Sequence, residues 1–163
     1  METTQNHAVV AAKAEFLRAK DRVVKAIDTT AEDRLCWSPS PTARTPLEVA
    51  AHCAIMLPLM MAWLQGKPHP FGDMEAMDTK ARQDEAAFTT REQVMSALDT
   101  HCAAYTNWLE SLTPEQLETP VGFGEMSFPL TDAITFAADH FRGHASQIDY
   151  IQTIYGDRDF HMS

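Results

Sequence analysis

The sequence predicts an all-α fold, an antiparallel four-helix bundle with a small irregular or hairpin segment before its last helix. Four long segments carry apolar residues at steps of three and four residues, the spacing that gathers side chains on one face of a helix. No convincing series of strands accompanies them, and amphipathic helices without strands bury their apolar faces against one another. The length of 163 residues favours a single domain, residues 1–163.

The first expected helix extends from about Thr4 to Asp28. Apolar residues recur there at helical spacing, and the segment contains neither glycine nor proline, which helix interiors disfavour. The link that follows, from Thr29 to Arg44, contains Leu35, Trp37 and prolines. These residues indicate a short turn of helix followed by an extended piece of chain.

The second expected helix has a sequence signature at its start. Thr45-Pro46-Leu47-Glu48 has the Thr-x-x-Glu form of a capping box, with proline at the first helical position, where its missing N–H is not needed. The helix is expected to bend near Pro58, because an internal proline removes one backbone hydrogen bond. It should run to about Gln65 and stop at Gly66.

The segment 66–89 is long for a connection in a compact domain, so we expect a short helix at 78–87 within it. The third long helix should open at Thr89 or Thr90 and reach about Leu112. Its inward-facing seam steps by four and three residues, which is typical of packing in a helical bundle. The seam consists of Val94, Leu98, His101, Tyr105, Trp108 and Leu112.

Two smaller elements are expected before the last helix. Thr113-Pro114-Glu115-Gln116 repeats the capping pattern and predicts a brief helix, and Glu118 to Phe128 (ETPVGFGEMSF) predicts a small hairpin. The fourth long helix is expected from about Pro129 to Tyr155, with Gly156 as its stop.

The composition excludes several classes of partner. The chain has 13 Lys and Arg against 23 Asp and Glu, a formal net charge of −10. Because nucleic acids and anionic membranes are bound by basic surfaces, we expect neither as a partner. The longest apolar run, Ile55 to Leu64, is far shorter than the roughly 20 residues that span a bilayer. The first residues lack the basic segment of a signal peptide, so a cytoplasmic location is expected.

The cysteines give no sign of a disulfide framework. Cys36, Cys53 and Cys102 are odd in number and widely spaced, and they form no C-x-x-C pair. Each has apolar neighbours in the sequence, so we expect all of them to be small buried hydrophobic residues.

Three of the seven histidines are predicted to face the interior. His140 and His144 lie one turn apart on the apolar side of the fourth helix, and His52 lies on the apolar face of the second. Burying an imidazole without a partner costs about 1–3 kcal/mol, so each of these rings needs a hydrogen bond or a ligand. A shared divalent metal would satisfy all three lone pairs. Three separately hydrogen-bonded core histidines, or histidines that line an empty pocket, remain the alternatives.

Two residues near these histidines are candidate catalytic groups. Glu48 lies one turn before His52 and could act as a general base, as a fourth ligand or as a group that orients a ligand; its competing role in the capping box is favoured. Gln147, one turn after His144, could orient a ligand or a substrate, or form a hydrogen bond between helices.

His101 faces inward on the third helix, where a structural role is favoured over an approach to the site. Solvent exposure is expected of His7, His69 and His161.

Three segments together resemble the DinB/YfiT-like superfamily, whose members are four-helix bundles. The matching segments are RLCWSPSPTART before the second helix, TPLEVAAHCA, which contains His52, and DHFRGHASQIDYIQTIYG, which has the form H-x-x-x-H-x-x-Q-I. The resemblance covers essentially the whole chain in order and length. It implies neither polymerase nor DNA-binding activity.

The resemblance implies a metal site and small-molecule chemistry. His52, His140 and His144 match the three family ligands of a divalent ion such as zinc or nickel, with the remaining positions left to water. Some members are S-transferases that use a low-molecular-weight thiol such as bacillithiol or mycothiol, and one group isomerises maleylpyruvate. Members commonly form dimers, so a homodimer is expected.

The leading functional hypothesis is a metal-dependent, thiol-dependent S-transferase that acts on a small-molecule electrophile. Three neutral histidine ligands with an open position are typical of a catalytic site, and the metal would lower the pKa of a bound thiol or water. Two alternatives stay open. A metal-dependent hydrolase would use the same ligands, and a non-catalytic, stress-related dimeric bundle would use the metal for stability.

Overall fold

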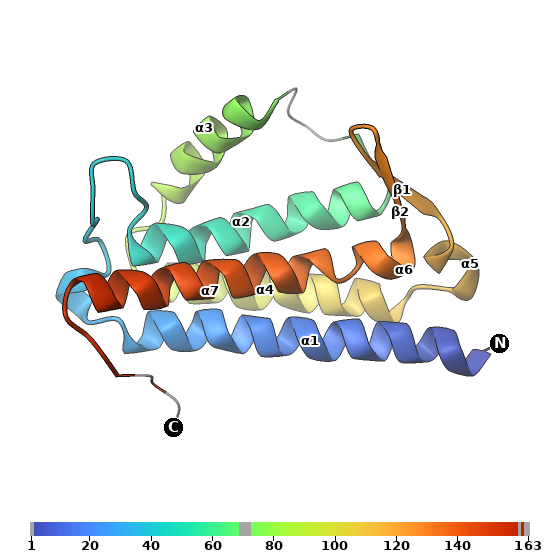
Figure 1. Cartoon of the computed structure of the whole chain (residues 1–163), viewed down its shortest axis with the longest axis horizontal. Helices are drawn as coiled ribbons and strands as arrows, with labels where there is room; N and C mark the ends of the chain where they lie inside the picture. Colours follow the sequence, from blue (N-terminus) through green and yellow to red (C-terminus); the bar gives the residue numbers. More distant parts are fainter. Residues whose placement is uncertain (1, 69–72, 160, 162–163) are drawn as a thin grey trace.

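Four long helices form the body of the protein in a computed structural model that describes residues 2–68, 73–159 and 161. Figure 1 shows them lying side by side along the long axis of the molecule. Their bounds are α1 (Glu2–Thr29), α2 (Pro46–Leu64), α4 (Arg91–Glu110) and α7 (Phe136–Ile154). The predicted four-helix bundle is therefore confirmed.

The four helices pack in a closed ring. α1 packs against α7, α7 against α2, α2 against α4, and α4 against α1. In Figure 1, α1 and α7 run in one direction and α2 and α4 run in the other, so the bundle is antiparallel between these pairs and parallel within each. This ring makes α2 and α7, the two helices that carry the inward-facing histidines, direct neighbours.

The parallel course of α2 and α4 depends on the segment between them. It contains helix α3 (Met74–Glu85), which lies on the outside of α2 and returns the chain to the end where α2 began (Figure 1). The predicted helix at 78–87 is confirmed, but it starts earlier than expected. The Asp73 carboxylate accepts a hydrogen bond from the Ala76 N–H, and this cap allows the helix to begin at Met74.

Capping side chains define the predicted helix starts. Reciprocal side-chain and backbone hydrogen bonds form capping boxes at α2, α4 and the short helix α5 (Pro114–Leu117). The pairs are Thr45 with Glu48, Thr90 with Gln93, and Thr113 with Gln116. In the link after α1, the expected helical turn is the 3₁₀ helix η1 (Glu32–Arg34).

A small antiparallel hairpin stands at one end of the bundle, as predicted. Strand β1 (Pro120–Phe123) pairs with β2 (Met126–Pro129), with Val121 opposite Phe128. Gly124, in the connecting turn, has φ of 60°, a conformation that favours glycine. The Trp63 indole Nε1–H donates to the Gly122 carbonyl at 2.6 Å and so fastens the hairpin to the end of α2.

The last helix is broken, and the expectation of one continuous helix from Pro129 to Tyr155 is wrong in this respect. The short helix α6 (Leu130–Ala133) ends at Ile134, and α7 starts at Phe136. The Ala138 N–H bonds to Thr135 at 3.0 Å, which deprives the Ile134 carbonyl of its helical donor. The Tyr105 hydroxyl donates to that carbonyl at 2.8 Å and so satisfies it across the bundle.

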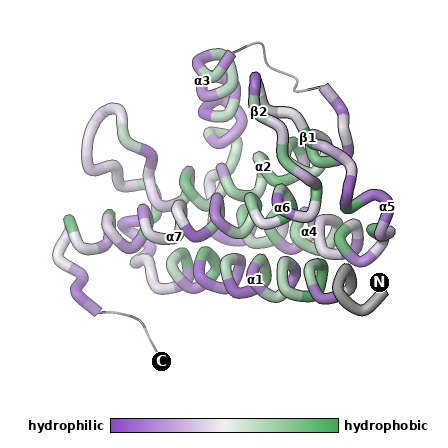
Figure 2. The backbone as a smooth tube through the Cα atoms, turned by 45° about the vertical axis from the view of Figure 1, so that its right-hand side comes forward, coloured by the Kyte–Doolittle hydropathy of each residue, from purple (hydrophilic) through white to green (hydrophobic). Residues whose placement is uncertain are grey.

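The core is built from aromatic rings between α1, α4 and α7, and from small residues along α2. Phe16 contacts Tyr105 and Phe141 edge-on, with ring centroids 4.7 and 5.1 Å apart. Figure 2 shows hydrophilic and hydrophobic residues interspersed along α1 and α7, the pattern of amphipathic helices. Burying the aromatic side chain of a residue such as Phe16 or Phe141 contributes about 1.5–3 kcal/mol to the stability of the fold.

Helix α2 is the most apolar element of the chain. Among the described residues it alone is long and apolar enough to cross a membrane, with a mean hydropathy of 1.7. Half of that window is buried inside the protein, however. This burial is what a helix packed inside a bundle shows.

One of the three cysteines departs from the expected burial. Cys53 and Cys102 are buried, whereas Cys36 is exposed. Cys36 lies in the turn after η1, where its neighbours Leu35 and Trp37 pack inward. Because the turn directs the side chain between them outward, an apolar sequence neighbourhood did not imply burial.

Candidate metal centre

Three imidazoles meet where α2 faces α7. His52 projects from α2, and His140 and His144 project from adjacent turns of α7. One ring nitrogen of each lies within 4.8 Å of the other two. The ring centroids are 4.4 Å apart for the two α7 histidines, and 4.7 and 5.2 Å from His52 to His144 and His140. The structure thus brings together the three histidines that the sequence singled out.

A buried carboxylate orients His52. The Nδ1 atom of His52 lies 2.7 Å from Oε1 of Glu85, which belongs to α3 and has a side chain only 1% exposed. Because an ionised carboxylate only accepts hydrogen bonds, Nδ1 carries the proton and Nε2 keeps a free lone pair. Histidines that bind metals commonly have such a carboxylate partner, which holds the ring in the ligating tautomer.

The amide of Gln147 has the same relation to His144. Its Oε1 atom lies 2.7 Å from Nδ1 of His144, one turn earlier on α7. The amide oxygen accepts the Nδ1 proton, so the lone pair of His144 is also on Nε2. Gln147 thus contacts a histidine of the cluster on its own helix, and a role in orienting a ligand stays a prediction.

His140 is the member of the cluster without a hydrogen bond. Its Nε2 atom is buried and has no partner among the described residues. Burial, with smaller contributions from the neighbouring His144 and His52, lowers the pKa of His140 to about 3. Burial likewise lowers the pKa of His144 to about 4, against the opposing hydrogen bond to Gln147. Both rings are therefore neutral at physiological pH.

These features fit a divalent metal ion. Neutral imidazoles offer lone pairs, two of the three rings are held in one tautomer, and the third has a buried nitrogen that nothing else satisfies. Unpaired buried polar atoms are uncommon in native proteins, and an absent ion is one physical reason for them. His52, His140 and His144 are the residues that would hold the ion.

Arg44 connects the cluster to α3. Its guanidinium donates from Nε to Glu85 at 2.7 Å and from a terminal nitrogen to Asp78 at 2.8 Å. Burial raises the pKa of Glu85, but the hydrogen bonds from His52 and Arg44 outweigh it and keep the pKa below its usual value. Glu85 therefore stays ionised against His52, and the arginine compensates its buried charge.

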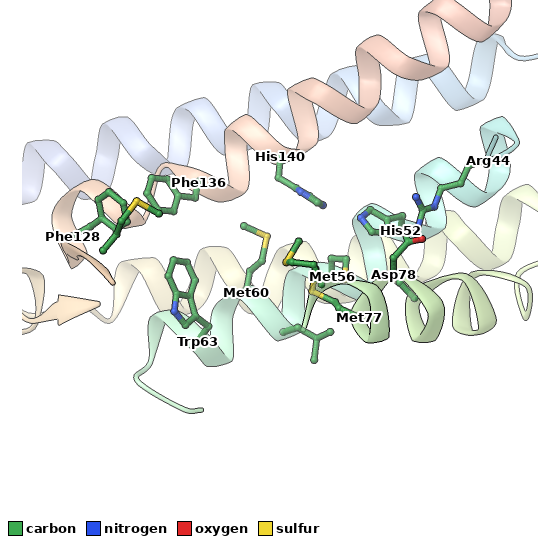
Figure 3. A pocket seen from close by; sticks show the side chains of 14 residues that line it. Arg44, His52, Met56, Met60, Trp63, Met77, Asp78, Phe128, Phe136 and His140 are labelled. Atoms are coloured by element: carbon green, nitrogen blue, oxygen red, sulfur yellow. Dashed lines mark hydrogen bonds and ion pairs between the residues drawn. The ribbon is translucent and has the colours of Figure 1, made fainter. Parts of the chain in front are cut away.

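A cavity of about 540 Å³ opens beside the histidines, between α2, α3, α7 and the hairpin. Figure 3 shows Arg44, Asp78 and His52 at one end of it and Trp63, Phe128 and Phe136 at the other. Most of the remaining wall is methionine. A small molecule in this cavity would lie directly against His52 and His140.

The other candidate residues lie apart from the cluster. The Glu48 carboxylate accepts the Thr45 backbone N–H at 2.8 Å, so its capping role is confirmed, and Glu48 is not among the residues that line the cavity. His101 bonds the Ala54 carbonyl instead of approaching the site. His7 is exposed, His161 is half-buried beside Asp157 where exposure was expected, and His69 lies outside the described residues.

Sequence reasoning missed Glu85 and Arg44. Asp78, Ala81 and Glu85 follow helical spacing, and this could have indicated one face of a helix. Two acidic residues on a short polar helix, however, are ordinarily solvated. Only the packing of α3 on α2 shows that this face is turned towards a histidine and an arginine.

Comparison with known families assigns the chain. A family model of the DinB superfamily matches residues 15–148, most of the sequence. The chain belongs to the DinB superfamily. The resemblance noted from the three sequence segments is thereby confirmed. The DinB match spans α2 and most of α7, the two helices that bear the histidine cluster.

Solved structures share the DinB fold at low sequence identity. An uncharacterized protein from Clostridium difficile 630 is 15% identical with a TM-score of 0.73, over 88% of this chain and 94% of that one. YfiT from Bacillus subtilis, described as a probable metal-dependent hydrolase with an unusual four-helix bundle topology, is 13% identical with a TM-score of 0.68, over 96% and 90%.

A third solved structure with a similar fold is a mycothiol-dependent maleylpyruvate isomerase. It is 12% identical to this chain with a TM-score of 0.68, over 86% of this chain and 60% of the isomerase. At these identities the likeness shows the fold alone. A comparison with curated proteins gave no match.

Proposed function

We propose that this DinB protein binds one divalent metal ion, zinc or nickel, through His52, His140 and His144, and that it uses the ion as a thiol-dependent S-transferase. The observation that carries the proposal is the buried, unpaired Nε2 of His140 beside two histidines whose protons are held away from the cluster. A metal ion accounts for all three lone pairs, whereas separate hydrogen bonds leave that of His140 unexplained.

The residues of the site have distinct parts in the proposed reaction. A divalent ion supplies positive charge that lowers the pKa of a bound thiol. Glu85 and Gln147 hold His52 and His144 in the tautomer that presents Nε2. The apolar cavity wall positions an electrophile and excludes water. The thiol sulfur then bonds to the electrophilic carbon, the leaving group departs with the bonding electrons, and the thiol proton passes to solvent.

The same site would also support hydrolysis. A bound metal activates water as well as a thiol, so attack by water needs no separate general base. The described acidic residue that lines the cavity, Asp78, is hydrogen-bonded to both Arg44 and Arg82, so a hydrolase would rely on metal-activated water alone. The description of YfiT as a probable metal-dependent hydrolase keeps hydrolysis as the second candidate. The mycothiol-dependent isomerase supports a thiol cosubstrate for this fold, which makes a thiol the first to test.

The experiment has two steps. The protein is purified without a histidine tag, and its metal content is measured; one ion per chain is expected, and a chain without bound metal would contradict the proposal. The loaded protein is then assayed with bacillithiol, mycothiol or glutathione against chlorinated and epoxide electrophiles.

The His144→Ala variant separates catalysis from a structural role. Loss of activity while the metal-free protein keeps its melting temperature supports an enzyme, whereas equal losses of activity and of metal-free stability support the non-catalytic metal-binding bundle. We also propose a cytoplasmic homodimer, for which light scattering of the purified protein is the direct test of the oligomeric state.

A further inference from the structure

The cavity beside the histidines has two chemically different ends. Figure 3 places Arg44, Asp78 and His52 at one end, and the Trp63 and Phe136 rings at the other. The charges at the polar end are already paired, because Arg44 bonds both Asp78 and Glu85. A ligand therefore finds its polar partner at the histidines and an uncharged apolar wall beyond them.

The apolar end is pre-formed by aromatic rings. Trp63 and Phe136 are stacked, with centroids 6.1 Å apart and ring planes 13° apart. Phe128 of the hairpin meets Phe136 edge-on at 5.3 Å. The hydrogen bond from Trp63 to the Gly122 carbonyl holds the indole in place. Flat, fixed surfaces of this kind bind alkyl or aryl groups at a small entropic cost.

Methionines form the rest of the wall. Five of the nine methionines in the chain line this one cavity: Met56, Met60, Met74, Met77 and Met126. They come from α2, α3 and β2, so the concentration is created by the fold and not by a run in the sequence. Flexible, polarisable thioethers adapt to apolar groups of different shapes. Met74 and Met126 are also exposed, which places them at the mouth.

We propose that this cavity binds an amphiphilic small molecule, with an alkyl or an aryl body among the methionines and aromatic rings and a single metal-binding head at the histidines. The position of the head rests on the proposed metal site; the position of the body does not. Because histidine binds a metal ion as the neutral imidazole, three histidine ligands would leave the positive charge of a divalent ion uncompensated, and this charge favours a head that ionises. The substrate class is thus an apolar molecule with one ionisable polar end.

The body is tested first on metal-free protein with the neutral dye N-phenyl-1-naphthylamine, whose fluorescence rises in apolar surroundings. Met60→Gln, in the wall, is compared with Met61→Gln, the next residue of α2. Both side chains are half-buried and pack against the core, but Met61 is not among the residues that line the cavity. Met60→Gln should weaken dye binding about fivefold or more, and Met61→Gln should leave it within about twofold. Equal effects of the two variants would overturn the inference.

The head is tested on zinc-loaded protein with alkyl hydroxamates of increasing chain length, by calorimetry. Affinity should rise by about fourfold for each buried methylene and level off once the chain reaches the aromatic end. Affinity that does not depend on chain length would overturn the inference. If the protein takes up no zinc while the dye still distinguishes Met60→Gln from Met61→Gln, the proposed metal site is wrong and the apolar cavity stands. If it takes up zinc but binds no hydroxamate, the inferred position of the head is wrong.

Discussion

The Nδ1 atom of His101, on α4, lies 2.7 Å from the carbonyl oxygen of Ala54, on α2. Ala54 precedes Pro58 by four residues, and proline has no N–H to donate to it. His101 supplies the missing donor from a neighbouring helix, so α2 continues through Pro58 to Leu64 without a buried unpaired carbonyl. His101, which could have belonged to the metal cluster, instead stabilises the helix that carries His52.

This relationship predicts coupling between His101 and Pro58. His101→Ala should lower the free energy of unfolding by about 1–3 kcal/mol, because it leaves the Ala54 carbonyl without a donor. In a Pro58→Ala background the new backbone N–H satisfies that carbonyl, so the same substitution should cost less. Urea denaturation of the four proteins measures the difference, and an equal cost in both backgrounds would contradict the relationship.

Metal binding should stabilise the wild-type protein through His140. With metal at about a hundredfold its Kd, the stabilisation is about 2.7 kcal/mol, or roughly 5–11 °C in Tm for a domain of this size. His140→Ala should remove the shift in a thermal melt. His101→Ala is the matched control, because it is expected to lower the starting Tm and keep the shift. A shift that persists in His140→Ala would argue against the three-histidine site.

Glu85→Gln should weaken metal binding while preserving the shape of the site. The oxygen of the neutral amide still accepts the hydrogen bond from Nδ1 of His52, but it lacks the negative charge that makes the imidazole a stronger ligand. We therefore expect the affinity for the metal to fall about tenfold to a hundredfold. Asp84→Asn, on the same helix but paired with Lys80 at the surface, should change the affinity by less than about twofold. Competition with a chelating dye measures both, and similar losses in the two variants would refute a specific role for Glu85.

The metal-free protein should lose stability in mild acid. In the unfolded chain the histidines have a pKa near 6.5, whereas the folded pKa is about 3 for His140 and about 4 for His144. Between these values the unfolded state binds the additional protons, so stability is complete above about pH 6.5 and falls towards pH 4, by up to about 1.4 kcal/mol per pH unit for each ring. Urea midpoints with EDTA present check this, and His140→Gln/His144→Gln should flatten the decline.

Only Cys36 should react with a thiol reagent in the native protein. It is exposed, whereas burial raises the pKa of Cys102 to about 12 and also that of Cys53, which keeps both as thiols. Ellman's reagent should therefore detect one thiol per folded chain and all three after unfolding. Cys36→Ser should abolish the native reaction; a second reactive thiol would show that α2 or α4 opens readily.

The sequence alone determined the helices and the candidate ligands, because both are local patterns. Capping boxes at Thr45 and Thr113 depend on residues three positions apart, and the spacing of His140 and His144 places both on one face whatever the helix packs against. The break at Ile134 could not be predicted in this way, because the hydroxyl that satisfies its carbonyl comes from Tyr105, on another helix.

Only the tertiary structure decided which groups act together. Glu85 is separated from His52 by 33 positions and reaches it because α3 folds back over α2. The methionine wall likewise draws on α2, α3 and β2. Such a hydrogen bond or cavity joins segments that lie far apart in the sequence. The regular spacing of residues within one helix does not predict which distant segments meet. Helical periodicity predicts that His52 and His101 face the interior. Only the packing of the helices shows that His52 contacts the Glu85 carboxylate and that His101 contacts the Ala54 carbonyl.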